Sequence, residues 1–171
     1  TYISPDRFGI ITTDALEEII TENTRLVSIM FSNNEIGTIE PIKELAAIAH
    51  KHGALFHTDA VQAVGHVPID VKDLGIDMLS ASAHKFNGPK GAGFLYIRSG
   101  TEINPLNDGG SQERGLRAGT ENIAEIVGMA TALKTNIKHI EENKKYIYSL
   151  EQVLLSGIGD LDCIKNGADN H

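Results

Sequence analysis

Three short polar segments carry side chains that could do chemistry, and each one follows an apolar run: residues 33–35, 57–62 and 82–85. In the last segment, Lys85 stands beside a histidine, and a lysine enclosed in a crevice can act as a nucleophile or Schiff-base amine. Asp59 follows apolar residues, so we expect its carboxylate to be poorly hydrated and to need a cationic partner such as a protonated ring nitrogen. Asn34, Gln62 and Ser82 add neutral groups that could orient a ring oxygen or a phosphate.

The elements that must position these segments are predicted from hydrophobic periodicity. Residues 26–31, 54–57 and 77–82 are short, apolar runs typical of strands in a parallel sheet. Residues 92–98 form a fourth run, too soon after the third for a parallel return, which predicts an antiparallel strand. Because ligands bind outside the carboxyl ends of strands in open α/β sheets, the three polar segments should meet in one crevice.

Helices are predicted between and after the strands. One helix should run from Thr13, its N-cap, to about residue 22, and another should start at Pro41 and end near Gly53. The three-four apolar rhythm of residues 126–154 predicts one long helix, or two joined near the polar residues 141–145. Residues 161–164 resemble the start of another strand, and Cys163 within them should be a small buried side chain.

Composition excludes several classes of protein. The 171 residues carry a net charge of −8 with no basic run, which argues against nucleic acid as a partner. No apolar run approaches the roughly 18 residues of a membrane span. A single cysteine excludes a disulfide framework and suits the reducing cytoplasm, so we expect a cytoplasmic α/β protein.

A resemblance becomes specific in four strings: NNEIG, HTDAVQAVGHVPID, SAHKFNGPKGAGFLY and ERGLRAGTEN. They resemble the NifS-like cysteine desulfurases of the class V aminotransferase family, which depend on pyridoxal 5′-phosphate (PLP). The resemblance implies the central part of a fold-type I large domain, a mostly parallel sheet with helices on both faces. It assigns residues 1–122 to that domain, and residues 123–171 to a connecting helix and the beginning of a small α+β domain.

The resemblance also implies roles for single residues. Lys85 would bind the PLP aldehyde covalently, and together with His84 it is the expected catalytic set. Asp59 would pair with the pyridinium nitrogen, and Gln62 would hydrogen-bond the phenolate oxygen. The remaining expected cofactor-binding residues are Asn34 near that oxygen, Ser82 and His84 at the phosphate, and Thr120 at the phosphate of a neighbouring subunit in a homodimer.

The activity implied is conversion of L-cysteine to L-alanine, with sulfur passed as an enzyme persulfide to an acceptor or scaffold protein for iron–sulfur cluster or thio-cofactor synthesis. In family members the sulfur-accepting cysteine lies beyond the matched region, and the segment around Cys163 does not resemble its loop. The chain therefore resembles a central fragment, and we expect it to bind PLP weakly and to be inactive alone.

Three alternatives stay open. One is a selenocysteine lyase or another class V aminotransferase, although the NNEIG and RAGTEN strings favour the desulfurase branch. A second is a catalytically dead fragment that only folds and dimerises. The third is a metal site at His57 and Asp59, which share a strand face, but no third ligand is evident and we expect no metal.

Overall fold

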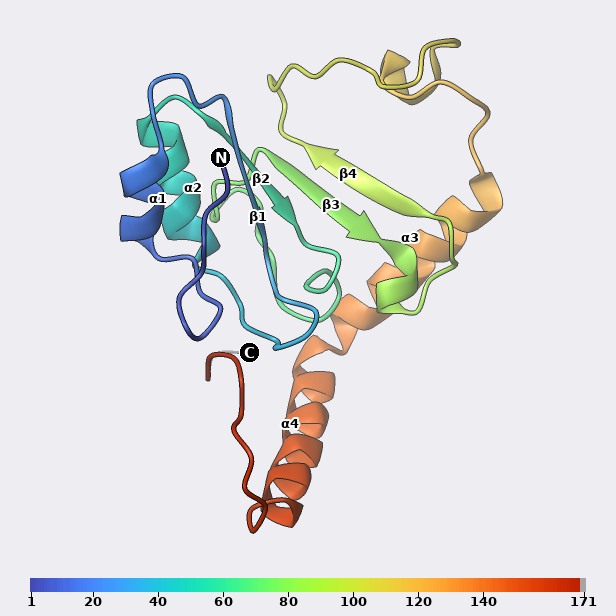
Figure 1. Ribbon diagram of the computed structural model, residues 1–171. Coiled ribbons are helices and arrows are strands. Elements are labelled where there is room, and N and C mark those ends of the chain that lie inside the picture. Colours follow the sequence, from blue (N-terminus) through green and yellow to red (C-terminus); the bar gives the residue numbers. More distant parts are fainter. Residues whose placement is uncertain (170–171) are drawn as a thin grey trace.

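A computed structural model of the chain describes residues 1–169 (Figure 1). The four strands are β1 (Leu26–Met30), β2 (Leu55–Asp59), β3 (Met78–Ser82) and β4 (Gly93–Ile97). The α-helices are α1 (Thr13–Ile19), α2 (Ile42–Lys51), α3 (Ile123–Lys138) and α4 (Ile140–Gly157), and two 3-10 turns are η1 (Ala83–Phe86) and η2 (Gln112–Gly115).

The strands form one sheet in the order β1-β2-β3-β4. β1, β2 and β3 are parallel, and β4 returns antiparallel to β3, as the short spacing predicts. The connection from β3 to β4 is too short for a crossover, whereas α2 supplies the crossover between β1 and β2. The predicted fold class is confirmed.

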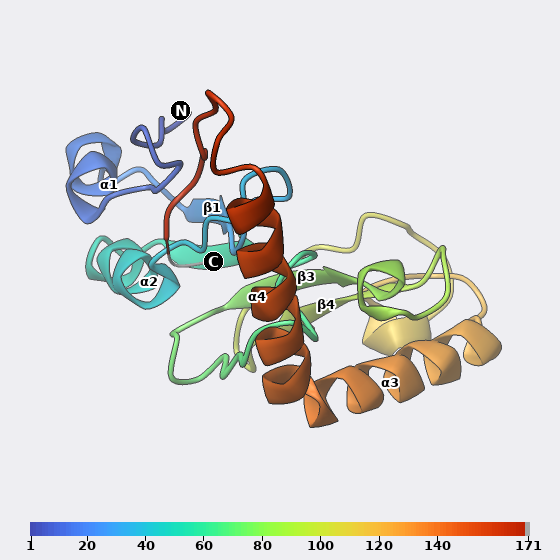
Figure 2. The same cartoon turned by 90° about the horizontal axis from the view of Figure 1, so that it is seen from below.

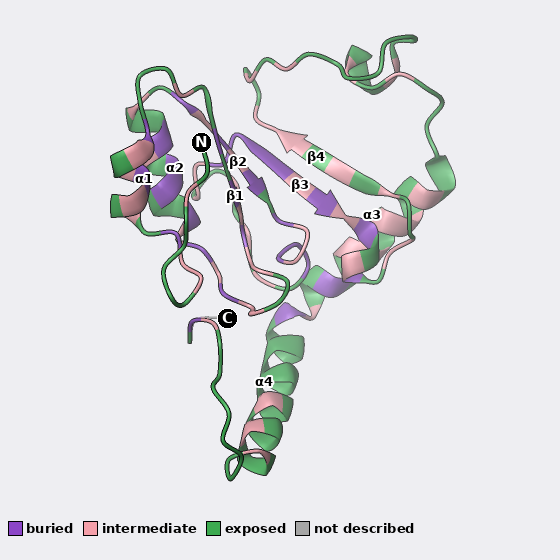
Figure 3. Cartoon of the chain, viewed as in Figure 1, coloured by how far each residue is buried: buried purple, intermediate pink, exposed green. Residues whose placement is uncertain are grey.

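The core lies between the sheet and the helices α1 and α2 (Figure 3). Val27 and Ile29 of β1 and Phe56 of β2 are buried against the apolar face of α2. The N-cap of α1 is Thr12, whose Oγ1 accepts the Ala15 N–H at 3.2 Å, so the prediction of Thr13 was wrong by one residue. Two successive threonines offer the same cap chemistry, and only the backbone conformation selects between them.

The buried carboxylate of Asp77 lies at the other end of the sheet, away from the three polar segments. Asp77 is 4% exposed, and its Oδ2 accepts the Phe56 N–H at 2.8 Å and lies 2.7 Å from His50 Nε2. Its Oδ1 lies 3.2 Å from Arg98 Nη1. This Asp77 hub therefore connects α2, β2 and the end of β4 in one network.

Helix α4 extends away from the sheet, and the chain after it returns toward the loop that follows β1 (Figures 1 and 2), where Ala168 N–H donates to Thr38 Oγ1 at 3.0 Å. The long apolar rhythm forms two helices that break at His139, directly before the polar residues 141–145. Most of α4 is exposed, including the large apolar side chains of Ile147, Leu150 and Leu154. No helix within residues 1–169 is long and apolar enough to cross a membrane.

The strand predicted at residues 161–164 does not form, and Cys163 is exposed rather than buried. Both expectations were wrong for the same reason. A strand needs a neighbour to satisfy its backbone groups, and no strand of residues 1–169 lies beside this segment.

Candidate functional site

The sheet register brings the three polar segments to one edge. Met30 aligns with Asp59, and Asp59 aligns with Ser80 in the adjacent strand. The backbone continues this alignment beyond the strands, because Phe31 N–H donates to Asp59 O at 2.7 Å and Ala60 N–H donates to Ser80 O at 3.0 Å. The carboxyl ends of β1, β2 and β3 therefore lie side by side, as the sequence predicts.

Asn34 is exposed at the tip of a tight loop after β1. The side-chain oxygen of Asn33 accepts the N–H groups of Glu35 at 2.8 Å and Ile36 at 3.1 Å, which shapes the turn. The base of the loop is held by Thr38, which is fully buried and donates through Oγ1 to Phe8 O at 2.8 Å. The loop is thus anchored at its base by a buried hydrogen bond, and Asn34 is exposed at its tip.

A second buried group holds the same loop and was not predicted from the sequence. Glu40 is 7% exposed, and its Oε2 accepts the Ile11 N–H at 2.8 Å. Burial raises the pKa of the Glu40 carboxyl above its ordinary value. The hydrogen bond from the Ile11 N–H lowers the pKa, but by less. The partner lies 29 positions away in the sequence, so no local pattern could have indicated it.

Asp59 is the last residue of β2, and its side chain is exposed. The expectation of a poorly hydrated carboxylate was therefore wrong for this chain, because the residue projects beyond the buried part of the strand. Its Oδ1 accepts the Val61 N–H at 3.0 Å, which orients the carboxylate. Gln62 follows in the turn after β2 and is half-buried.

Ser82, His84 and Lys85 occupy the end of β3 and the turn η1. Ser82 Oγ and His84 Nδ1 lie 2.8 Å apart, so a hydroxyl and an imidazole form one hydrogen-bonded pair. Lys85 is half-buried, and within residues 1–169 its amine has neither a hydrogen bond nor an ion pair. The turn η1 therefore holds a lysine with an uncommitted amine directly after a hydrogen-bonded hydroxyl–imidazole pair, and β3, which leads into it, is the neighbour of the strand that ends at Asp59.

A row of hydrogen bonds crosses the sheet just before this edge. His57 Nδ1 lies 2.8 Å from Ser28 Oγ on β1, and His57 Nε2 lies 2.9 Å from Ser80 Oγ on β3. Burial lowers the pKa of His57, and the Asp59 charge opposes this shift. A neutral imidazole donates through one nitrogen and accepts through the other, so it can satisfy both serines.

The structure does not bring Thr120 to the other candidate residues. Because β4 is antiparallel to β3, its last residue, Ile97, aligns with Met78 at the start of β3, so β4 ends far from Ser82. The connection after β4, which contains Thr120, projects away from η1 (Figure 1). Among residues 1–169, no hydrogen bond joins Thr120 to the other predicted site residues.

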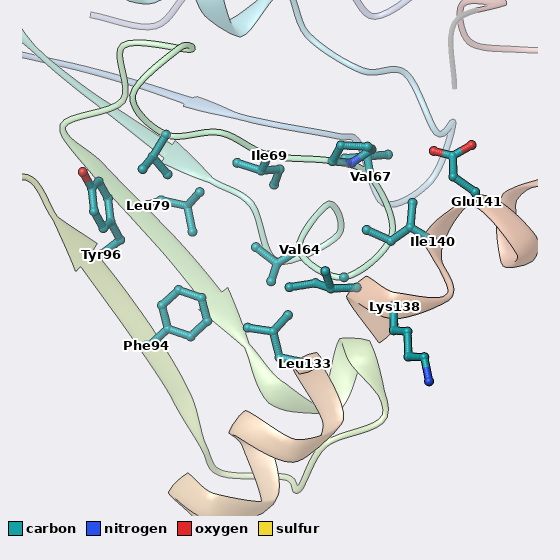
Figure 4. Close-up of a pocket in the computed structure, with 14 residues that line it drawn as sticks. Val64, Val67, Ile69, Leu79, Phe94, Tyr96, Leu133, Lys138, Ile140 and Glu141 are labelled. Atoms are coloured by element: carbon teal, nitrogen blue, oxygen red, sulfur yellow. The ribbon is translucent and has the colours of Figure 1, made fainter. Parts of the chain in front are cut away.

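An apolar cavity in the described chain lies elsewhere (Figure 4). It has a volume of about 520 Å³ and separates α3 from one face of the sheet. Leu79, Phe94, Tyr96 and Leu133 line it, and none of the seven predicted site residues does. The polar edge and the apolar cavity are therefore separate features.

Comparison with known proteins gives a family and several relatives. The profile of the aminotransferase class-V family matches residues 1–171. A protein of Methanosarcina thermophila named cysteine desulfurase IscS is 53% identical over 158 residues, which is 92% of this chain and 39% of that protein. A cysteine desulfurase of a Nostoc species is 47% identical over 171 residues, covering 98% of this chain and 42% of that protein.

The chain also superimposes on solved structures, again over most of its own length and less than half of theirs. A NifS-like protein superimposes with a TM-score of 0.91 at 44% identity, over 95% of this chain and 45% of that chain. A structure described as SspA in complex with cysteine has a TM-score of 0.76 at 46% identity, over 78% of this chain and 39% of that chain. The chain spans about two fifths of the length of the curated relatives that it matches.

Proposed function

Because the chain belongs to the class-V aminotransferase family, we propose that it supplies the cofactor-binding core of a PLP-dependent cysteine desulfurase. The observation that supports this proposal is that η1, which holds Lys85 with its uncommitted amine, directly follows β3, and the register of β3 with β2 aligns Ser80 with Asp59. The names of the relatives support the choice of L-cysteine as substrate, and L-alanine is the product proposed with it.

The donor set at this edge fits PLP. Lys85 has an uncommitted amine that would hold the aldehyde carbon covalently. Asp59 keeps its second oxygen for a protonated ring nitrogen, since only Oδ1 accepts a backbone N–H. When bound, PLP supplies an electron sink for reactions at the α-carbon of an amino acid.

The other residues of the edge would orient the cofactor. The Gln62 amide would donate to the phenolate oxygen, and the Asn34 amide would lie near the same oxygen. Ser82 and His84, already paired at 2.8 Å, would bind the phosphate. His84 is also proposed to take part in the proton transfers that accompany the reaction, because it lies next to Lys85 in the chain.

The proposal extends to the whole protein. Thr120 lies on a connection that leaves its own sheet edge, which supports a homodimer in which this residue reaches the partner's phosphate. The sulfur would pass to an acceptor or scaffold protein for iron–sulfur cluster or thio-cofactor synthesis. We also propose a cytoplasmic location, which suits an exposed unpaired cysteine, and a domain boundary near residue 122, just before α3 begins.

Borohydride trapping of the chain with PLP, followed by peptide mass mapping, tests the proposal. We expect a phosphopyridoxyl adduct concentrated on Lys85, weaker in Asp59→Ala and Ser82→Ala. Lys90→Ala is the matched control, because Lys90 is an exposed lysine five positions away and should leave the adduct unchanged. Labelling spread evenly over surface lysines, or no labelling, would contradict the proposal.

A further inference from the structure

The turn that carries Lys85 is held from two sides by side chains of other segments. His66 Nε2 lies 2.7 Å from the main-chain oxygen of Lys85 itself. Asn136 Nδ2 lies 2.7 Å from the main-chain oxygen of the next residue, Phe86. We call His66 and Asn136 the lysine-turn clamp.

The hydrogen bond from His66 has a defined direction. A carbonyl oxygen only accepts, so Nε2 of His66 carries the proton and donates, whether the ring is neutral or charged. His66 follows Gly65, whose positive φ of 83° turns the chain toward η1. A Cβ at Gly65 would lie 2.9 Å from Cβ of Phe86, so this approach is possible only for glycine.

This contact connects both halves of the proposed site. His66 lies four positions after Gln62 in the segment that follows Asp59, and its side chain hydrogen-bonds the main-chain oxygen of Lys85. The backbone of Lys85 is therefore held by the same segment that begins at Asp59.

Asn136 forms the other half of the clamp from α3. It is 8% exposed, and its Nδ2 also donates to Ala132 O at 2.9 Å within the helix. Its Oδ1 accepts from Asn87 Nδ2 at 3.2 Å, at a residue with a left-handed φ of 64°. A buried asparagine is unfavourable in a helix interior unless it is satisfied, and here both polar atoms are used.

We propose that His66 and Asn136 are positioning residues that hold the Lys85 backbone so that its amine stays at the sheet edge. The proposal rests on the proposed function, in which this amine binds PLP. The lysine side chain is long and flexible, so fixing the backbone on consecutive carbonyls restricts where the amine can reach. Through Asn136, the position of α3 also determines the position of the amine.

The first measurement is hydrogen exchange of the chain without PLP. The amides of Asn87 and Gly88 both donate to Ala83 O and report on the closure of the turn. His66→Ala should speed their exchange about three- to tenfold, as expected for the loss of one hydrogen bond. His66→Gln should restore slow exchange, because its amide nitrogen reaches as far as Nε2 of histidine.

The second measurement is the ratio of phosphopyridoxyl label on Lys85 to label on Lys90 at limiting PLP. The ratio should fall about three- to tenfold in His66→Ala and recover in His66→Gln. Asn136→Asp, which cannot donate to Phe86 O, should lower the ratio in the same way. His52→Ala is the matched control, since His52 pairs through Nε2 with Glu17 at 2.8 Å, away from η1.

The outcomes separate the two proposals. Equal labelling of Lys85 and Lys90 in the unsubstituted chain would overturn the proposed function and the positioning role with it. Selective labelling of Lys85 that persists in His66→Ala would overturn the positioning role alone. Unchanged exchange of Asn87 and Gly88 in His66→Ala would also overturn it, and faster exchange with an unchanged label ratio would leave His66 a purely structural role.

Discussion

Two fully buried threonines lie at the base of the proposed site and differ in one respect. Thr38 Oγ1 donates to Phe8 O at 2.8 Å and accepts the Ala168 N–H at 3.0 Å. Thr58 Oγ1, next to Asp59, has no hydrogen-bond partner among the described residues. Both side chains are 0% exposed. Replacing each by valine keeps the approximate shape and the β-branching and exchanges only the hydroxyl for a methyl group, so the two variants form a matched pair.

The expected changes in the free energy of unfolding have opposite signs. Thr58→Val removes a buried hydroxyl that lost its water contacts without compensation, so it should stabilise the chain by about 1–2 kcal/mol. Thr38→Val removes two hydrogen bonds and leaves their partners without that contact, so it should destabilise by about 2–3 kcal/mol. The two variants should therefore differ by about 3–5 kcal/mol.

Urea unfolding followed by circular dichroism measures this difference. With a slope of about 2 kcal/mol per M, the midpoints of the two variants should lie about 1.5–2.5 M apart, with equal slopes. Two variants of equal stability, or a Thr58→Val variant less stable than the unsubstituted chain, would refute the reasoning from hydrogen-bond satisfaction.

Four further predictions test other parts of the structure. Asp77→Asn should destabilise the chain by about 2–3 kcal/mol in the same urea assay, because the charged acceptor of the Asp77 hub is lost. Burial holds the pKa of His57 below its ordinary 6.5, so stability should be full above that pH and fall as the pH drops through the lowered pKa. A pH series of unfolding midpoints should show this decline, and it should be flatter in His57→Gln. Gly65→Ala should lower the melting temperature, because φ is +83° and the added Cβ would meet Phe86 at 2.9 Å; an unchanged melting temperature would argue against this close approach. The exposed apolar residues of α4 should cause self-association that grows with concentration in light scattering, and Leu154→Glu should reduce it.

The main elements of the fold could be predicted because their signals are local. The apolar run of β1 and the short spacing between β3 and β4 each depend on neighbouring residues alone. The prediction failed where a distant partner decides the outcome. Residues 161–164 have strand composition but no adjacent strand in the described chain, so they form none and Cys163 is exposed.

In the candidate site, too, the features that depend on neighbouring residues could be predicted, and those that depend on distant segments could not. The polar segments that contain Asp59, Ser82 and Lys85 each follow an apolar run, which predicts that they begin at the same end of the sheet, and the parallel register of β2 and β3, with Asp59 aligned with Ser80, confirms this for the two strand ends. The hydration of Asp59 was predicted wrongly, since exposure at a strand end depends on what covers that end. The roles of the single residues toward PLP stay predictions.

By itself, the amino-acid sequence determined which chemical groups are present and at which strand ends they occur, because strand periodicity and motif strings are properties of neighbouring residues. Only the tertiary structure decided what holds those groups. The contacts of His66 and Asn136 with the lysine turn span 19 and 50 positions, and the row Ser28–His57–Ser80 joins three strands. Such contacts depend on how distant segments pack together, and that packing is decided by the fold of the whole chain.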